Sequence, residues 1–183
     1  MDIYGLMTDL MTEGRLFMRI LGIDPGFATV GWAVIDSDRG NLYPVAFGAI
    51  TTPAHTNFES RLLMIKNDLE TIIEKYSPSE MAIEELFFNT NITTGIAVAE
   101  ARGVILCTAF AKGLKISEYT PLQVKQSVVG YGKAEKHQVI AMVTSILKLK
   151  NPPKPDDTAD AVAIAICHSQ CLGSKIGKYY NQR

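Results

Sequence analysis

Long apolar stretches are missing from this sequence, and so are internal repeats, low-complexity segments and any strong excess of charge. No segment approaches the roughly 20 consecutive apolar residues that a membrane-spanning helix needs, so we expect no membrane partner. The first 17 residues carry three acids and neither a basic start nor a small-residue cleavage site, which argues against a secretory signal.

The length of the chain limits how many domains it can form. With 183 residues, it is long enough for one well-filled domain and short for two. We expect residues 1–17 to be a disordered N-terminal extension, residues 18–172 to form the domain, and residues 173–183 to be a basic tail.

Cysteine is scarce, and its three positions are Cys107, Cys167 and Cys171. An odd number at sparse positions argues against a disulfide framework and predicts reduced thiols, as in a cytoplasmic protein. Cys167 and Cys171 lie four residues apart with His168 between them, a spacing that a zinc site can use. Because the sequence offers no second pair of ligands, we interpret these cysteines as packing residues.

Charge is nearly balanced overall, with a formal net charge of -1, but it is unevenly distributed. Acidic residues greatly outnumber basic ones between Asp24 and Glu100, whereas basic residues dominate between Arg102 and Lys154. This asymmetry predicts one region that meets phosphates only through a metal ion and another that attracts them directly. Lys148 and Lys150 are equally consistent with an ordinary solvated helix surface.

Apolar patterns predict an α/β domain with a mixed central sheet. Three strands at 18–24, 30–36 and 41–52 follow one another closely, which favours an antiparallel meander. The elements expected next are helix 56–76, strand 81–86, helix 91–112, strand 115–120, and three helices that begin near 121, 134 and 156. Thr56 and Glu59 have the spacing of a capping box at the start of the first helix.

The predicted helix at 91–112 is apolar on two sides. Ile96, Gly103 and Phe110 belong to one side, and Ile105 and Ala109 belong to the other. A helix that is apolar on two sides needs two partners. We expect one side to pack on the sheet and the other to form a subunit interface.

Asp24 ends the central apolar run of the chain, directly before Pro25 and Gly26. A carboxylate at the end of a buried strand is costly to desolvate unless a positive charge meets it. The Pro-Gly turn leaves room for a metal ion or a phosphate. The simpler interpretation is that Asp24 caps a turn, as aspartate often does.

Three more carboxylates are candidates to join Asp24. Glu84 lies on the fourth predicted strand, and Asp157 and Asp160 lie one turn apart at the start of the last helix. If the first and fourth strands are neighbours and the last helix points at their ends, the four groups converge. Repulsion among them would raise their pKa values or demand cations, and oxygen ligands select Mg²⁺ or Mn²⁺. Two such ions about 3.5 to 4 Å apart would support hydrolysis of a phosphodiester.

Six motifs, in order from Met18 to about Cys171, together resemble the RuvC-type Holliday-junction resolvases. They are Gly22-Ile23-Asp24-Pro25-Gly26, Ala82-Ile83-Glu84 with Phe87, Ala101-Arg102-Gly103, Val124-Lys125-Gln126 with Val129-Gly130, Ala134-Glu135-Lys136, and Asp157-x-x-Asp160-Ala161. Each motif is weak alone, whereas six in sequence are specific. The resemblance implies a ribonuclease-H-like fold with a five-stranded sheet flanked by helices. It also implies a structure-selective endonuclease that makes paired symmetric nicks in four-way DNA junctions during recombination and repair.

The resemblance also implies roles for individual residues and partners. The metal-binding and catalytic acids would be Asp24, Glu84, Asp157 and Asp160, and the DNA contacts would be Phe87, Lys125 and Lys136. The family further implies a homodimer formed through helix 91–112 and a branch-migration complex of the RuvA and RuvB type as partner. Whether Asp156 shares the metal site, and whether Phe88 wedges DNA or packs in the core, stays open at this stage.

Three other functions are compatible with parts of the sequence. An actin-like or sugar-kinase-like ATPase also places aspartate and glycine after a first strand, but it needs two such lobes. A related nuclease of the YqgF type acts on RNA and shares the first aspartate, whereas Lys125 and Lys136 favour the junction enzyme. A junction-binding protein without cleavage activity is disfavoured because all four acids are present.

Overall fold

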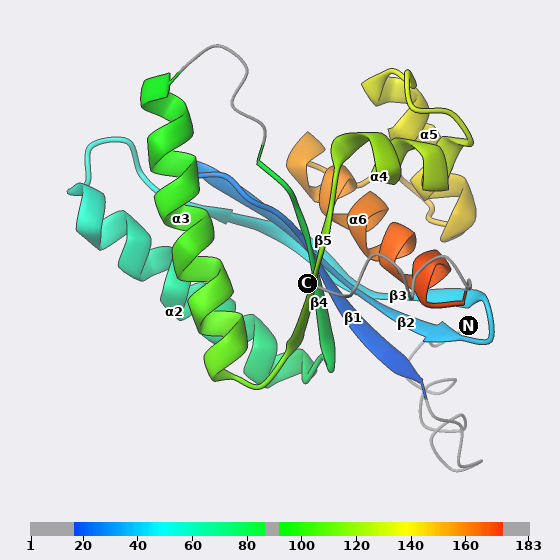
Figure 1. The fold of residues 1–183 in the computed structure, drawn as a ribbon, viewed down its shortest axis with the longest axis horizontal. Coiled ribbons are helices and arrows are strands. Elements are labelled where there is room, and N and C mark those ends of the chain that lie inside the picture. The colour runs from blue at the N-terminus through cyan, green and yellow to red at the C-terminus, as the bar shows by residue number, and fades with distance from the viewer. Residues whose placement is uncertain (1–16, 87–91, 174–183) are drawn as a thin grey trace.

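A five-stranded sheet lies at the centre of the molecule (Figure 1). The computed structural model describes residues 17–86 and 92–173. The predicted N-terminal extension and basic tail lie almost wholly outside these residues, as do Phe87 and Phe88.

The sheet contains two antiparallel and two parallel pairings. Its strands are β1 (Met18–Asp24), β2 (Thr29–Asp38), β3 (Asn41–Thr51), β4 (Glu80–Glu84) and β5 (Lys115–Tyr119), in the spatial order β3-β2-β1-β4-β5. β1, β2 and β3 form an antiparallel meander, and β4 and β5 continue from β1 in parallel. The prediction of a mixed sheet is therefore confirmed, and the first strand does lie beside the fourth.

Helices cover both faces of the sheet (Figure 1). One layer consists of α2 (Phe58–Tyr76) and α3 (Ile92–Ala111), and the other of α4 (Pro121–Val129), α5 (Lys136–Ile146) and α6 (Asp156–Gly173). None of the helices in the described ranges combines the length and the apolar character that crossing a bilayer requires.

The central strand β1 is buried on both sides. Ile20, Leu21 and Ile23 are fully buried, and successive side chains point to opposite faces of the sheet. Ile20 packs in the apolar cluster that contains α6, whereas Leu21 and Ile23 pack in the cluster that contains α2 and α3. Burial on both faces explains why this strand is apolar at successive positions rather than at alternate ones.

The start of α2 differs from the predicted capping box. The helix begins at Phe58, its N-cap is Asn57, and the Asn57 side chain makes no capping hydrogen bond. The ring of Phe58 instead stacks on Phe27 at a centroid distance of 4.6 Å. The predicted Thr56–Glu59 capping box is therefore not formed. The first helical residue packs against the turn between β1 and β2 instead.

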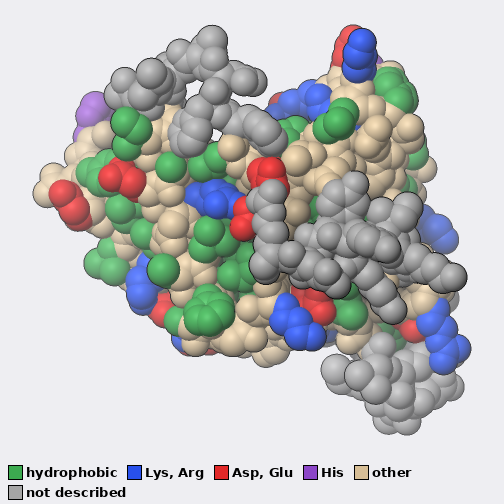
Figure 2. Space-filling model, in the orientation of Figure 1, with side chains coloured by type: hydrophobic (Ala, Val, Ile, Leu, Met, Phe, Trp, Pro, Cys, Tyr) green, Lys and Arg blue, Asp and Glu red, His purple; other side chains and the backbone are tan. Residues whose placement is uncertain are grey.

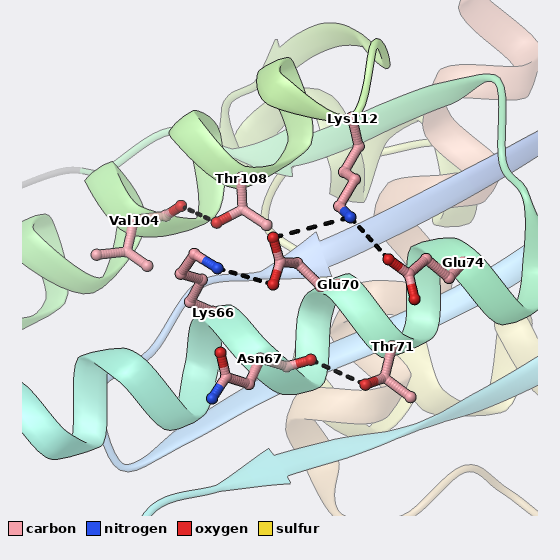
Figure 3. A network of polar contacts seen from close by, with 8 residues as sticks. All are labelled: Lys66, Asn67, Glu70, Thr71, Glu74, Val104, Thr108 and Lys112. Carbon is pink, nitrogen blue, oxygen red and sulfur yellow. Dashed lines mark hydrogen bonds and ion pairs between the residues drawn. The ribbon is translucent and has the colours of Figure 1, made fainter.

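Charged side chains connect α2 to α3 (Figure 3). Lys112, in the turn directly after α3, has its Nζ 2.7 Å from Glu74 Oε1 and 3.8 Å from Glu70 Oε1 on α2. Lys66 Nζ lies 2.7 Å from Glu70 Oε2 on the same helix. Exposed ion pairs of this kind contribute little individually, and the apolar contacts between the helices account for most of the packing energy.

The two apolar sides of α3 have different surroundings. Ala101, Ile105 and Ala109 are buried among residues of α2 and the sheet. Phe110 is 77% exposed and Ile96 is 53% exposed on the other side. Figure 2 shows hydrophobic side chains scattered over this part of the molecular surface. The expected packing side is therefore confirmed, and the exposed side retains the apolar character expected of an interface.

Candidate functional site

Asp24 and Glu84 lie at the same edge of the sheet. Asp24 is the last residue of β1 and Glu84 is the last residue of β4. The two strands are parallel neighbours, with Ile23 paired to Ile83. The next residue on each strand is therefore a carboxylate, and both acids stand at the carboxyl end of the sheet.

Two glycines allow α6 to bring its acids to this edge. A Cβ atom added at Gly22 of β1 would lie 2.2 Å from Ala161 O, and one added at Gly31 of β2 would lie 1.9 Å from Asp157 O. Any side chain larger than hydrogen would push the helix away. Gly31 is also the ladder partner of Asp24, so the backbone of Asp157 rests directly beside the first carboxylate.

Three carboxylates form a compact group. One ligand oxygen from each of Asp24, Asp157 and Asp160 lies within 4.8 Å of the others. Glu84 is outside this tight group but interacts electrostatically with Asp24 and Asp160. Within the described ranges, no other set of His, Cys, Asp or Glu side chains forms such a group.

Burial and mutual repulsion raise the pKa values of two of these acids. Burial, followed by the charges of Asp160, Glu84 and Asp157, raises the pKa of Asp24 to about 8. Burial, followed by the charge of Asp160, raises the pKa of Glu84 to about 7. Carboxyl groups with such pKa values are partly protonated at neutral pH, and a divalent cation that binds them displaces the protons and relieves their repulsion. An all-carboxylate donor set fits a hard cation such as Mg²⁺ or Mn²⁺.

Lys136 is part of the same charge cluster. Its Nζ lies 2.9 Å from Asp160 Oδ2 and 3.8 Å from Asp156 Oδ2. Although burial lowers the pKa of Lys136, the hydrogen bond to Asp160 and the neighbouring carboxylates raise it above its usual range. The structure therefore places this lysine against a predicted metal ligand, whereas the sequence suggested only a phosphate contact.

Lys125 approaches the site from α4. Its charge lowers the pKa of Glu84, as does that of Lys136. A capping box in which Thr120 Oγ1 accepts from Gln123 N holds the start of α4. Both predicted lysines thus lie on the helices that flank the carboxylates, whereas Phe87 lies outside the described residues.

Asp157, and not its neighbour Asp156, belongs to the compact carboxylate group. The Asp156 side chain is largely exposed and faces Lys136. Both acids lie in the first turn of α6, where negative charge is favourable.

An arginine on α3 reaches the end of β4. Arg102 Nε donates a hydrogen bond to Glu84 O at 3.3 Å, and Nη2 lies 2.5 Å from Glu118 Oε2. Arg102 belongs to one of the six motifs, but the motif alone suggests no role for it. The signal in the sequence was an arginine directly after the buried Ala101 in a mostly apolar helix.

The turn after Asp24 is held by residues that sequence analysis did not single out. Thr52 Oγ1 donates to Phe27 O at 2.7 Å, and Arg61 Nε donates to Thr52 Oγ1 at 2.9 Å. The Arg61 guanidinium also lies 3.8 Å from the centroid of the Phe27 ring. These contacts join segments that are far apart in sequence, and no local pattern indicates them.

A buried polar network involves none of the four candidate metal ligands. His168 Nε2 lies 2.8 Å from Glu80 Oε2, and His168 Nδ1 lies 2.8 Å from Tyr119 Oη. Both ring nitrogens are therefore engaged within the protein. Cys167 is fully buried in the apolar cluster beneath α6. These contacts support the interpretation of Cys167 and Cys171 as packing residues rather than zinc ligands.

Comparison with known proteins relates this site to one family. The sequence model of the family described as crossover junction endodeoxyribonuclease RuvC matches residues 20–168. The protein of that name from Desulfitobacterium hafniense is 53% identical over 155 residues, covering 85% of this chain and 94% of its own. The protein of that name from Heliobacterium modesticaldum is 55% identical over 155 residues, covering 85% and 96%.

The fold leads to the same family. The structure of Thermus thermophilus RuvC in complex with a Holliday junction substrate has a TM-score of 0.79 and 33% sequence identity to this chain. The match covers 83% of this chain and 93% of the other. Sequence and fold thus point to the same group of proteins, over the segment that contains all four acids.

Proposed function

The chain belongs to the RuvC family of crossover junction endodeoxyribonucleases, and from that premise we propose that it resolves four-way (Holliday) DNA junctions by metal-dependent hydrolysis of phosphodiester bonds. The observation that carries this proposal is the convergence of Asp24, Asp157 and Asp160, with Glu84 beside them, at one edge of the sheet. A protein that only binds junctions has no need of buried, mutually repelling carboxylates.

The four acids would hold the divalent cations. When bound, Mg²⁺ or Mn²⁺ would supply a more acidic water molecule and stabilisation of negative charge on the phosphate. Asp24 and Glu84 have raised pKa values and would release protons as cations bind. Lys136 would keep part of the negative charge compensated and orient Asp160 through their hydrogen bond.

DNA would approach from the side of α4 and α5. Lys125 and Lys136 would meet backbone phosphates there, and Phe87 would stack on a base near the junction centre. Support for the lysines comes from their electrostatic effect on Glu84, which places positive charge next to the carboxylates that would face the scissile phosphate. Phosphate contacts of this kind orient the nucleic acid and supply salt-dependent affinity.

A homodimer would form through the exposed side of α3. The support is the apolar surface around Ile96 and Phe110, which a monomer leaves exposed to water. Two copies joined in this way would present two sites to one junction and give paired, symmetric nicks. A branch-migration complex of the RuvA and RuvB type would be the partner, an expectation that rests on the family alone.

The test is cleavage of a synthetic four-way junction, a linear duplex and an RNA hairpin, each offered as substrate with and without Mg²⁺. We expect paired symmetric nicks that are confined to the junction and require the cation. Equal cleavage of linear duplex would reject the proposal. Preferential cleavage of the hairpin would favour an RNA nuclease of the YqgF type, and tight junction binding without nicks would favour a binding protein.

A further inference from the structure

Arg102 connects α3 to the end of the strand that carries Glu84. Its Nε donates to the backbone oxygen of Glu84, and its Nη2 forms an ion pair with Glu118 on β5. The Arg102 side chain is 15% exposed, whereas Glu118 is 48% exposed. One guanidinium therefore bridges two neighbouring strands from the helix that lies over them.

Glu84 lies at a strand end where the sheet pairs it on one side only. The paired register between β1 and β4 ends at Ile23 and Ile83, so Glu84 has no ladder partner on β1. On the other side, Glu85 N donates to Tyr119 O at 2.8 Å, which still ties the chain to β5. The Arg102 hydrogen bond supplies a further contact at this strand end.

Glu84 lies among carboxyl groups that repel it when they are ionised. The charge of Asp160 acts on its carboxyl group, and Glu84 in turn raises the pKa of Asp24. Repulsion between buried like charges favours conformations in which the strand end moves away. A residue that holds the backbone in place opposes that movement.

The contact of Arg102 is with the backbone rather than with the carboxylate. The positive charges that lower the pKa of Glu84 are those of Lys125 and Lys136. Within the guanidinium of Arg102, Nε donates to the backbone oxygen of Glu84 and Nη2 pairs with the Glu118 carboxylate. Arg102 therefore acts on the position of Glu84 rather than on its charge. A lysine at the same position would keep the positive charge but could not donate to Glu84 O and to Glu118 from two separate nitrogens.

We propose that Arg102 is a positioning residue that holds Glu84 beside Asp24, Asp157 and Asp160, with Glu118 fixing the guanidinium from its outer side. This inference rests on the proposed function of the carboxylates as cation ligands. Outer-sphere contacts that orient a ligand commonly change metal affinity by roughly 10- to 100-fold when they are removed. We expect the Arg102 contact to fall at the lower end of that range, because it orients only one of the four acids.

The primary test measures cation binding without DNA. Titration calorimetry with MnCl₂ would compare the unaltered protein with Arg102→Ala, Arg102→Lys and Glu118→Gln. We expect roughly 10-fold weaker Mn²⁺ binding for Arg102→Ala, a similar loss for Arg102→Lys, and a smaller loss for Glu118→Gln. Because Glu118 acts through Arg102, the double variant Arg102→Ala/Glu118→Gln should bind Mn²⁺ no more weakly than Arg102→Ala alone.

The second measurement separates positioning from DNA contact. At saturating junction and subsaturating Mn²⁺, single-turnover cleavage by Arg102→Ala should fall about as much as Mn²⁺ affinity does, while junction affinity stays within about 3-fold. Lys112→Ala is the matched control, because it removes a cation at the C-terminal end of α3 that pairs with α2 carboxylates away from the site. It should leave Mn²⁺ affinity and cleavage unchanged.

Several outcomes would overturn the inference. Unchanged Mn²⁺ affinity in Arg102→Ala would do so, and full recovery in Arg102→Lys would show that only the charge matters. A parallel loss of junction affinity would make Arg102 a DNA contact. If Arg102→Ala does not fold, unchanged Mn²⁺ affinity in a folded Glu118→Gln variant contradicts the role of the pair. Failure of the unaltered protein to nick junctions would reject the proposed function, whereas the calorimetry would still report on Arg102.

Discussion

Asp24 is the residue in which burial and like charge act together most strongly. Its pKa is raised to about 8, chiefly by burial and then by Asp160, Glu84 and Asp157. Between about pH 4 and pH 8, the folded protein therefore retains a proton that the unfolded chain has released. The contribution of this group to stability falls as the pH rises through that window. The same arrangement that prepares a cation site thus destabilises the protein when no cation is bound.

Replacing Asp24 by asparagine should separate the role of this residue in the cation site from its effect on stability. At pH 8 without divalent cations, we expect Asp24→Asn to raise the urea midpoint of unfolding, because the buried negative charge is gone. The variant should lose junction nicking yet keep junction binding, since phosphate attraction comes mainly from lysines. Urea titrations at pH 6 and pH 8, with gel-shift and nicking assays, measure all three quantities.

Asp68→Asn, an exposed acid on α2, is the control for this experiment and should change none of these quantities. An unchanged urea midpoint at pH 8 in Asp24→Asn would contradict the electrostatic explanation. Loss of junction binding together with cleavage would indicate a structural role for Asp24.

Lys125 provides a prediction about DNA affinity. Its removal in Lys125→Ala should weaken junction binding and make the dependence of log K on log salt shallower by about 1, as for a single phosphate contact. Binding isotherms at several salt concentrations measure the slope. Lys150→Ala removes an exposed lysine beyond α5 and should leave the slope unchanged. An unaltered slope in Lys125→Ala would remove this residue from the phosphate-binding surface.

Among the helices and strands, the close packing of α6 on the sheet is what sets the geometry of the site. Gly31→Ala would place a methyl group against the backbone oxygen of Asp157. We expect the helix start to shift, which should weaken Mn²⁺ binding at least several-fold and lower stability by about 1–3 kcal/mol. Mn²⁺ calorimetry and urea unfolding provide the two readouts.

Gly48→Ala on β3 is the comparison variant. Its new Cβ would meet the Trp32 side chain at 3.2 Å rather than the backbone of α6. It should change stability without changing Mn²⁺ affinity. Wild-type Mn²⁺ affinity in Gly31→Ala would show that the distance between α6 and the sheet does not govern the site.

Local patterns predicted most elements because each leaves a signal over neighbouring residues. The apolar run before Asp24 predicted β1, and the apolar sides of the segment 91–112 predicted α3 and its packing face. Thr56 and Glu59 had the right spacing for a cap, but the stacking of Phe58 on Phe27 accompanies a helix start after that spacing. Tertiary contacts thus overrode a weak local preference at that helix end.

The site was predictable only where its residues end regular elements. Asp24 and Glu84 follow apolar strands, and Asp157 and Asp160 open an apolar helix, so their convergence followed from the sheet order. Gly22 and Gly31 gave no comparable signal, because a glycine in a strand does not show which backbone approaches it. The contacts of Arg102 join α3 to two strands, and only the folded chain brings these segments together.

At the scale of the whole molecule, the exposed side of α3 predicts self-association. Phe110→Glu places a charge in that apolar surface and should convert the proposed dimer to a monomer without lowering the urea midpoint of unfolding. Sedimentation velocity measures the oligomeric state. The monomer should give single, uncoupled nicks in a junction rather than paired ones.

Leu63→Glu is the matched control, since Leu63 is 55% exposed on α2 and lies outside the expected interface. It should leave the oligomeric state unchanged. A dimer that persists in Phe110→Glu, or one that is lost equally in Leu63→Glu, would place the interface elsewhere.

The charge asymmetry of the sequence has a structural counterpart. The acids that converge come from β1, β4 and the start of α6, whereas Lys125 and Lys136 come from the helices beside them. Positive charge therefore lies next to the carboxylates, although the chain is nearly neutral overall. A protein with this distribution can attract phosphates locally and still keep an acidic cation site.

Anomalous diffraction from crystals soaked in MnCl₂ would locate bound cations directly. We predict anomalous peaks within coordination distance of carboxylate oxygens of Asp24, Asp157 and Asp160, with Glu84 adjoining them. Mn²⁺ bound only elsewhere, in a protein that nicks four-way junctions in solution, would contradict the assignment of these acids as the metal centre.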